Sequence, residues 1–380
     1  MDVLKKIAKK CVLGLLILSI EMPCSACFFR SADYVASYDG GKISAEVYKN
    51  LQQGVLGPVI RKIAKRDPGL VGRFSAAVQS GCVGEAFGLR VDGKTVESMV
   101  AAATKDEAYR FVAVGAFFDM LKLKLPKETL KQVDQMKKQL VDAEKAEAKM
   151  KKKQTAREVQ RAADERKRWA AQIACVENDA KRDVVFDYYY GDKGKEKPSN
   201  KDLRKYFDSN YIKFRCYLFQ YTAGGDEEKG VVQKQAEKFL EDAKTLGFEK
   251  AVVKEYDSRV AKSGQKSEGK ETDEEKVKMV SPVQFASKEE LRMDPSLEVI
   301  KNTPLNKVAS LDVGMAIVVF ERMGLTGADF KQRKNGLLHA VKGDEFEERL
   351  LKHGKTLGFK FNGKALVECR PSNIDLGGGD

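Results

Sequence analysis

The sequence predicts an α+β fold, in which a mainly helical protein carries a small inserted α/β unit. No glycine or proline interrupts the chain from Lys127 to Tyr190, which is typical of long helices. Two apolar segments with strand character, 213–219 and 315–320, enclose an amphipathic helix pattern. Apolar helix patterns also flank this unit on both sides. We therefore expect an antiparallel sheet within residues 206–325, and flanking helical segments that lie together in space.

The first expected elements lie in V-A-S-Y-D-G-G-K-I-S, residues 35–44. An apolar stretch is followed by a Gly-Gly turn, and Ser44 is placed to cap the helix that follows. Residues 54–95 contain more glycine and predict helices broken by loops. From Tyr109 on, apolar residues recur at spacings of three and four and give one helix face, and Pro126 suits the first turn of the next helix.

Long helices are expected within residues 109–190, and an antiparallel hairpin is the simplest account of the last part. Its many charges predict a solvated helix face. After a turn at 191–198, Ser199 and Asp202 resemble a capping box that opens a short helix.

The inserted unit is expected to start with the strand at 213–219, followed by a helix that ends at Gly247. Residues 259–278 are poor in apolar side chains and predict a mobile loop. The strand at 315–320 closes the unit, and residues 326–380 predict a C-terminal helical segment.

Residues 1–26 have the layout of a bacterial lipoprotein signal peptide. A head with four lysines precedes the apolar run 11–20, which is too short to span a bilayer, and Ser25 and Ala26 supply small residues before Cys27. Cys27 is then the lipid-bearing first residue of an extracytoplasmic protein anchored to the bacterial cell membrane. Cys24 stands where such signals usually have leucine. Ordinary cleavage, a retained anchor, or redox or metal chemistry at the C-x-x-C spacing of Cys24 and Cys27 are the alternatives.

The charge and the chain length limit the classes of function. The 380 residues suffice for two or three domains, and the formal net charge is +13. Removing residues 1–26, with four lysines, one aspartate and one glutamate, leaves +11. In the cytosol such a charge would indicate nucleic acid. Outside the cytoplasm we expect no nucleic-acid partner, and an anionic membrane or cell wall is the natural counter-surface.

Few residues are suited to metal or redox chemistry. Beyond Cys27 the cysteines lie far apart, so no disulfide pairing follows from their spacing. These are Cys82, Cys175, Cys216 and Cys369. The two histidines, His339 and His353, lie near the end and are expected to be surface or capping residues. We expect neither a metal nor another cofactor.

The order of these parts resembles the SurA and PrsA type of extracytoplasmic foldase, which carries a parvulin-like domain within a helical chaperone domain. The signal, the entry at 35–44 and three further runs carry the resemblance, whereas residues 54–108 match none of its parts. The runs are L-K-L-P-K-E-T-L, S-N-K-D-L-R-K-Y-F-D-S-N-Y-I-K-F-R and N-T-P-L-N-K-V-A-S. The resemblance implies a helical chaperone domain at 27–205, a parvulin-like domain at 206–325 and a segment at 326–380 that packs back on the helical domain.

The same resemblance bears on catalysis. An active parvulin domain uses two histidines, one in its first strand and one in its last. Here R-C-Y-L stands where the family has Arg-His-Ile-Leu, and G-M-A-I-V where it has Gly-Tyr-His-Ile-Ile. Cys216 and Ala316 therefore occupy the histidine positions, and we expect no catalytic residue.

The leading hypothesis is a membrane-anchored chaperone that binds unfolded or partly folded exported polypeptides, without prolyl isomerase activity. Aromatic residues of the long helices are the candidates for client binding, with core packing as the alternative for each. They are Phe117, Phe118, Trp169, Tyr188, Tyr189 and Tyr190. Two other functions stay open: an active peptidyl-prolyl isomerase with a rearranged site of Cys216, Tyr217 and an acid from 259–278, and a structural surface lipoprotein that acts as a spacer or adaptor. The sequence sets no oligomeric state.

Overall fold

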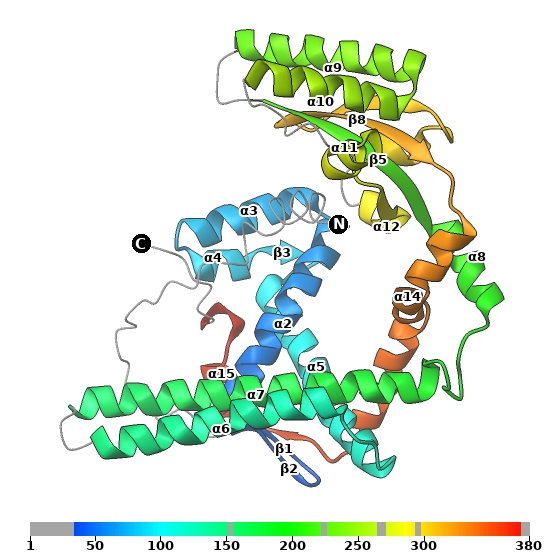
Figure 1. Ribbon diagram of the computed structural model, residues 1–380. Helices are drawn as coiled ribbons and strands as arrows, with labels where there is room; N and C mark the ends of the chain where they lie inside the picture. Colours follow the sequence, from blue (N-terminus) through cyan, green and yellow to red (C-terminus); the bar gives the residue numbers. More distant parts are fainter. Residues whose placement is uncertain (1–33, 151–154, 222–225, 264–270, 293–297, 374–380) are drawn as a thin grey trace. The chain divides into compact units, whose positions relative to one another are not determined.

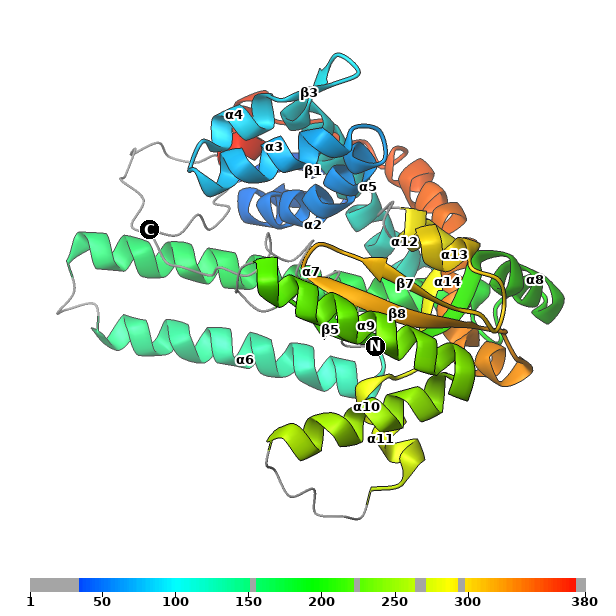
Figure 2. The same cartoon turned by 90° about the horizontal axis from the view of Figure 1, so that it is seen from above.

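The computed structural model describes most of the chain, and the α+β class is confirmed (Figures 1 and 2). The described residues are 34–150, 155–221, 226–263, 271–292 and 298–373. They form two compact units. Residues 199–337 make up an α/β unit, and the described residues before 199 and after 337 make up a helical unit. The α/β unit is thus inserted between two stretches of the helical unit.

A small sheet in the helical unit joins its two stretches of chain. Strands β1 (Tyr34–Tyr38) and β2 (Gly41–Ser44) form an antiparallel hairpin. On its other side β1 pairs with β9 (Lys360–Phe361), which comes from the C-terminal stretch. Ser44 caps α2 (Ala45–Ala64) as predicted, because its hydroxyl accepts a hydrogen bond from the Val47 amide at 3.2 Å.

The second part of α2 and the first part of α5 enclose a core cluster of their own with the elements between them. As predicted, helices alternate with short connections over 54–95. The elements are α3 (Pro68–Gln79), α4 (Val83–Gly88), β3 (Arg90–Val91), β4 (Lys94–Thr95) and α5 (Val96–Met120). Phe74 and Phe87 meet edge to face at 5.6 Å in this core cluster, which gives residues 54–108 a structural role.

Helices α6 (Lys127–Met150) and α7 (Ala156–Tyr190) lie side by side as the expected antiparallel hairpin (Figures 1 and 2). Along α6 only residues at alternating spacings of three and four escape full exposure, and α7 has the matching set. The two sets are Thr129, Val133, Met136, Leu140, Ala143 and Glu147 on α6, and Val159, Ala162, Arg166, Trp169 and Ile173 on α7. This seven-residue repeat is the seam of a coiled coil.

The α/β unit contains a four-stranded antiparallel sheet in the order β6-β5-β8-β7. Its strands are β5 (Tyr211–Gln220), β6 (Gln284–Ser287), β7 (Val308–Asp312) and β8 (Ala316–Met323). Its helices are α8 (Asn200–Asn210), α9 (Asp226–Leu246), α10 (Phe248–Ser263), α11 (Asp273–Val280), α12 (Lys288–Arg292) and α13 (Glu298–Asn302). Residues from α9, α10 and α11 cover one face of the sheet, and residues from α12 and α13 cover the other.

The prediction of a mobile loop over 259–278 is wrong for its two ends. Helix α10 continues to Ser263, and α11 begins at Asp273 behind a capping box of Thr272 and Glu275. Val277 of α11 is buried in the core cluster on this face of the sheet and Val280 packs against it, so two valines dock this charged helix. Residues 264–270 of the predicted loop lie outside the described residues.

The C-terminal stretch consists of α14 (Gly327–Gly354), α15 (Gly363–Glu368) and a short 3-10 turn, η4 (Pro371–Asn373). Helix α14 belongs to the α/β unit up to Leu337 and to the helical unit from Leu338 on. Among the described residues, no helix has both the length and the apolar character needed to cross a bilayer.

Candidate functional site

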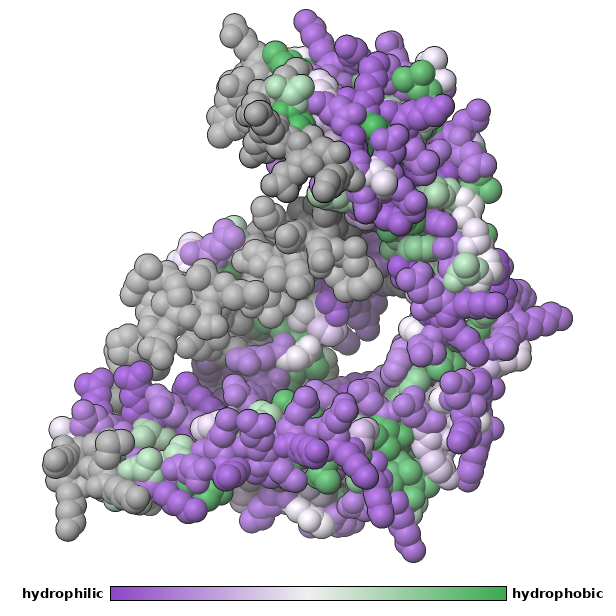
Figure 3. Space-filling view, in the orientation of Figure 1, coloured by the Kyte–Doolittle hydropathy of each residue, from purple (hydrophilic) through white to green (hydrophobic). Residues whose placement is uncertain are grey.

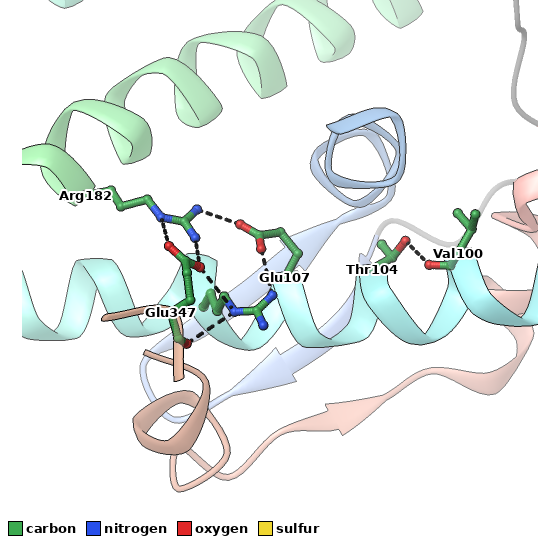
Figure 4. A network of polar contacts seen from close by, with 6 residues as sticks. Val100, Thr104, Glu107, Arg182 and Glu347 are labelled. Carbon is green, nitrogen blue, oxygen red and sulfur yellow. Dashed lines mark hydrogen bonds and ion pairs between the residues drawn. The ribbon is translucent and has the colours of Figure 1, made fainter. Parts of the chain in front are cut away.

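Polar contacts fix α14 against the long helices of the helical unit (Figure 4). Arg182 of α7 donates to Glu107 of α5 at 2.7 Å and to Glu347 of α14 at 3.1 Å. Arg110 lies 3.1 Å from the other oxygen of Glu107 and 3.3 Å from a carboxylate oxygen of Glu347. Burial alone would lower the pKa of Arg182, but the two carboxylates raise it above its ordinary value. The network thereby places the aromatic end of α7 beside α14.

Four of the six predicted client-binding residues meet at this end of α7. The ring centroids of Tyr188 and Tyr189 lie 5.2 Å apart, and those of Tyr189 and Tyr190 6.1 Å apart. Phe117 of α5 meets Tyr189 edge to face at 6.2 Å. We call Phe117, Tyr188, Tyr189 and Tyr190 the aromatic cluster.

Exposure divides the predicted residues into two groups. Phe117 and Phe118 are each 8% exposed and Tyr190 is 0% exposed, so these three residues pack inside the unit. Tyr188 and Tyr189 are half-buried, so part of each side chain is exposed to solvent. Trp169 is half-buried too, but it lies in the coiled-coil seam, about 28 Å from Tyr188 along the helix axis. The structure does not place Trp169 with the cluster.

Two cationic side chains, Lys195 and Arg349, contact rings of the aromatic cluster. The sequence analysis did not identify either of them as a site residue. The guanidinium of Arg349 lies 4.3 Å from the ring centre of Tyr189, and the Lys195 ammonium lies 5.1 Å from that of Tyr188. Arg349 is oriented by both carboxylate oxygens of Glu196, at 2.9 and 2.6 Å. Arg349 is far from the tyrosines in sequence, so only the fold brings them together.

Both histidines contact aromatic rings of the helical unit. His339 stacks on Phe186 with ring centroids 3.9 Å apart, and His353 lies 4.4 Å from the ring of Phe117. His353 is in the last turn of α14, as expected of a capping residue, and His339 keeps an exposed side. Their additional role is to pack α14 against the aromatic residues of α5 and α7.

The two positions that the resemblance assigns to histidine lie in the central strands of the α/β unit. Cys216 is opposite Phe320 in the β5–β8 ladder, and Ala316 is opposite Gln220. These residue pairs are four positions apart, which is about 13 Å along the strands. Both side chains are buried, and the methyl group of Ala316 has no donor or acceptor.

The environment of Cys216 keeps its thiol protonated. Burial raises the pKa of Cys216 to about 12, although Gln284 donates a hydrogen bond to its sulfur at 3.4 Å. The Ser281 hydroxyl donates to the Cys216 carbonyl oxygen at 2.8 Å. Tyr217 packs in the cluster on the opposite face of the sheet, so Cys216 and Tyr217 do not share a site.

Comparison with known proteins gives structural relatives only. No protein-family model matches the chain, and no curated protein matches it. The chain is similar to the solved structure of a foldase protein (PrsA) from Lactococcus lactis, with 12% identity over 89% of this chain and 98% of that one and a TM-score of 0.30. The chain is also similar to foldase protein PrsA from Streptococcus pneumoniae, with 12% identity over 75% of this chain and 99% of that one and a TM-score of 0.31. A third similar structure is a peptidylprolyl isomerase (PrsA) from Bacillus anthracis, with 14% identity over 66% of this chain and 96% of that one and a TM-score of 0.24.

Proposed function

We propose that this protein is an extracytoplasmic chaperone that binds unfolded or partly folded exported polypeptides and has no prolyl isomerase activity. The observation that carries the proposal is an inserted α/β unit whose two expected catalytic positions hold a buried thiol and a methyl group, Cys216 and Ala316. Such a unit retains the fold of a peptide-binding module while its chemistry is missing.

The helical unit supplies the proposed client surface at Tyr188 and Tyr189. Each ring offers apolar area, and Lys195 beside Tyr188 adds positive charge, whereas the charge of Arg349 is paired with Glu196. Hydrophobic residues on the face shown in Figure 3 lie in small groups between polar ones. Small apolar sites with cations suit weak binding of many different unfolded segments, because no single site needs a large matching surface.

An aggregation assay tests this proposal. The mature chain should suppress light scattering by a chemically denatured model enzyme, and Tyr188→Ser combined with Tyr189→Ser should weaken that suppression several-fold. Tyr256→Ser is the matched control, since Tyr256 is a half-buried tyrosine of the α/β unit. A wild-type chain that leaves aggregation unchanged would contradict the proposal.

The absence of isomerase activity needs its own measurement. Rotation about an X-Pro bond faces a barrier of about 18–20 kcal/mol, and neither Cys216 nor Ala316 offers a ring to orient the groups that lower it. An exchange measurement by NMR on a proline tetrapeptide should show only the uncatalysed rate. Turnover that is lost in Cys216→Ala would favour the rearranged-site isomerase instead.

We further propose that a lipid on Cys27 anchors the protein to the bacterial cell membrane. The basic head, the apolar run and the small residues before Cys27 support this, and Cys27 itself lies outside the described residues. Two or more acyl chains hold a protein firmly, since each buried methylene contributes about 0.8 kcal/mol. Cys27→Ala should therefore release or mislocalise the protein, whereas continued full membrane fractionation with the signal uncleaved would indicate a retained anchor.

The spacer or adaptor function is the second candidate, and the coiled-coil hairpin favours it. A two-helix arm can hold two partners apart without binding an unfolded chain. The aggregation assay separates the two functions, because a spacer has no reason to suppress scattering.

A further inference from the structure

We infer that the free edge of strand β7 binds an extended polypeptide segment by adding it to the sheet as a fifth strand. The inference rests on the proposed chaperone function and names how part of the client is held. The occupant is a stretch of unfolded polypeptide, recognised through its backbone amides and carbonyls.

The register of the sheet shows which backbone groups of β7 are available. The Val313 amide donates to the Ala316 carbonyl at 2.9 Å, and the Arg322 amide donates to the Lys307 carbonyl at 3.1 Å. In an antiparallel ladder the bonded pairs alternate, so odd-numbered residues of β7 bond to β8. The backbone groups of Val308, Ser310 and Asp312 therefore point away from the sheet. Within the described part of the chain, those of Val308 and Ser310 have no hydrogen-bond partner.

The β5–β8 ladder gives the same assignment independently. The Tyr221 amide donates to the Met315 carbonyl at 3.0 Å, so odd-numbered residues of β8 bond to β5. Even-numbered residues of β8 are then left to bond to β7, as the first argument requires.

The opposite edge of the sheet is largely occupied. By the same alternation, Phe285 and Ser287 of β6 point their backbone groups outward. The Ser287 amide already donates to the Glu290 carboxylate at 2.7 Å, and α12 begins directly after it. The free backbone groups of Phe285 alone are too few to pair with an added strand. Strand β7 is therefore the edge that can bind one.

Strand β7 is short and ends at a charged residue, Asp312, but it lacks three other features that protect an edge strand. Its sequence V-A-S-L-D contains no proline and no lysine, and its pairing with β8 has no bulge. Ser310 is exposed at its middle. Val299 of α13 and Leu305, in the connection between α13 and β7, are 43% and 55% exposed. The Arg322 guanidinium at the end of β8 donates a hydrogen bond to the Thr303 carbonyl of this connection at 2.5 Å.

A proline at position 310 tests the inference with little disturbance of the sheet. Because the Ser310 amide points outward, Ser310→Pro removes a donor from the free edge and leaves the bonds to β8 in place. Ser310→Ala keeps the backbone and is the matched control. Hydrogen exchange at the Val318 and Phe320 amides, which face β7, reports whether the β7–β8 ladder is intact in each variant.

The binding measurement uses the full mature chain and a fluorescein-labelled octapeptide of alternating valine and threonine, read by fluorescence anisotropy. Wild type and Ser310→Ala should bind it equally, and Ser310→Pro about tenfold more weakly, as expected for one lost hydrogen bond and a blocked edge. The same peptide with every backbone nitrogen methylated should bind wild type at least tenfold more weakly.

Three results would overturn the inference. One is no peptide binding by wild type, and another is equal binding by Ser310→Pro with an intact ladder. The third is a wild-type dimer that Ser310→Pro converts to a monomer, which would assign the edge to a second copy of this chain. Aggregation suppression that survives in Ser310→Pro would leave the chaperone function standing while the edge inference fails.

Discussion

The two halves of helix α7 differ in what holds them, although they form one uninterrupted helix. The half from Ala171 to Tyr190 packs against α2, α5 and α14 and buries Ile173, Val185 and Phe186. Of the residues of α7, all of which the structure describes, none before Ala171 is buried. We call residues 156–170 the outer half and residues 171–190 the inner half.

The outer half is held by the coiled-coil seam with α6, and a charged pair interrupts the apolar residues of this seam. Glu147 is the last seam residue on α6 and is buried, and its carboxylate lies 3.0 Å from the Arg166 guanidinium. The other carboxylate oxygen of Glu147 has no hydrogen-bond partner within the described chain. An ion pair in a seam sets the register of two helices more than it stabilises them.

The comparison shows that the local stability of each half of a helix depends on the elements that pack against it, more than on the helix propensity of its own residues. We therefore expect the inner half to unfold with the helical unit and the outer half to open locally at lower cost. This difference also suits the proposed function, because a firmly held inner half keeps Tyr188 and Tyr189 in place.

The largest expected effect is at the network of the inner half. Arg182→Met leaves Arg110 as the one arginine shared by the carboxylates of Glu107 and Glu347 and should lower the free energy of unfolding by about 2 kcal/mol, measured in urea. Arg161→Met is the control in the outer half, where an exposed pair with Glu165 contributes no more than about 0.5 kcal/mol. Equal losses in both variants would remove the distinction between the halves.

A smaller effect is expected at the seam. Glu147→Leu leaves Arg166 with the more distant Glu144, at 3.9 Å, and should destabilise the outer half by about 1 kcal/mol. Glu147→Leu with Arg166→Leu should restore that loss or exceed it, because apolar residues replace a buried ion pair. Urea unfolding together with cross-linking of the two helices checks stability and register, and a double variant weaker than the single one would show that the ion pair itself stabilises the hairpin.

The helix cap at the start of α7 should have a local effect. Thr155 accepts a hydrogen bond from the Glu158 amide at 3.3 Å, and Thr155→Ala should cost about 1 kcal/mol. Hydrogen exchange should speed up in the outer half and stay unchanged at Val185 and Phe186. Faster exchange in both halves would mean that α7 unfolds as one unit.

The smallest expected effect is a pH dependence of the same cap. Hydrogen bonds from the Thr155 backbone amide and hydroxyl lower the pKa of Glu158. A lowered pKa gives stability that is present above the unfolded pKa of about 4.3 and is lost as the pH falls through the folded value. Relative to the intrinsic exchange rate at each pH, the protection of amides in the first turn of α7 should therefore fall below about pH 4 in wild type, and Glu158→Gln should reduce this dependence.

Local interactions explain what could be predicted from the sequence. The caps at Ser44 and Ser199, the helix end at Gly247 and the two central strands depend on residues within a few positions of one another, and the structure has them as expected. The ends of 259–278 were mispredicted because charged composition outweighed the signal of the Thr272 cap and one buried valine.

The sequence by itself therefore determined the α+β class, the long helices and the presence of cysteine and alanine at positions 216 and 316. Only the tertiary structure decided that Tyr188 and Tyr189 keep an open side while Tyr190 is buried, that Arg349 lies over Tyr189, and that β7 is the free edge. Helix and strand signals arise between near neighbours in the chain. Burial and strand order depend on contacts between residues far apart in sequence, which form only when the elements pack.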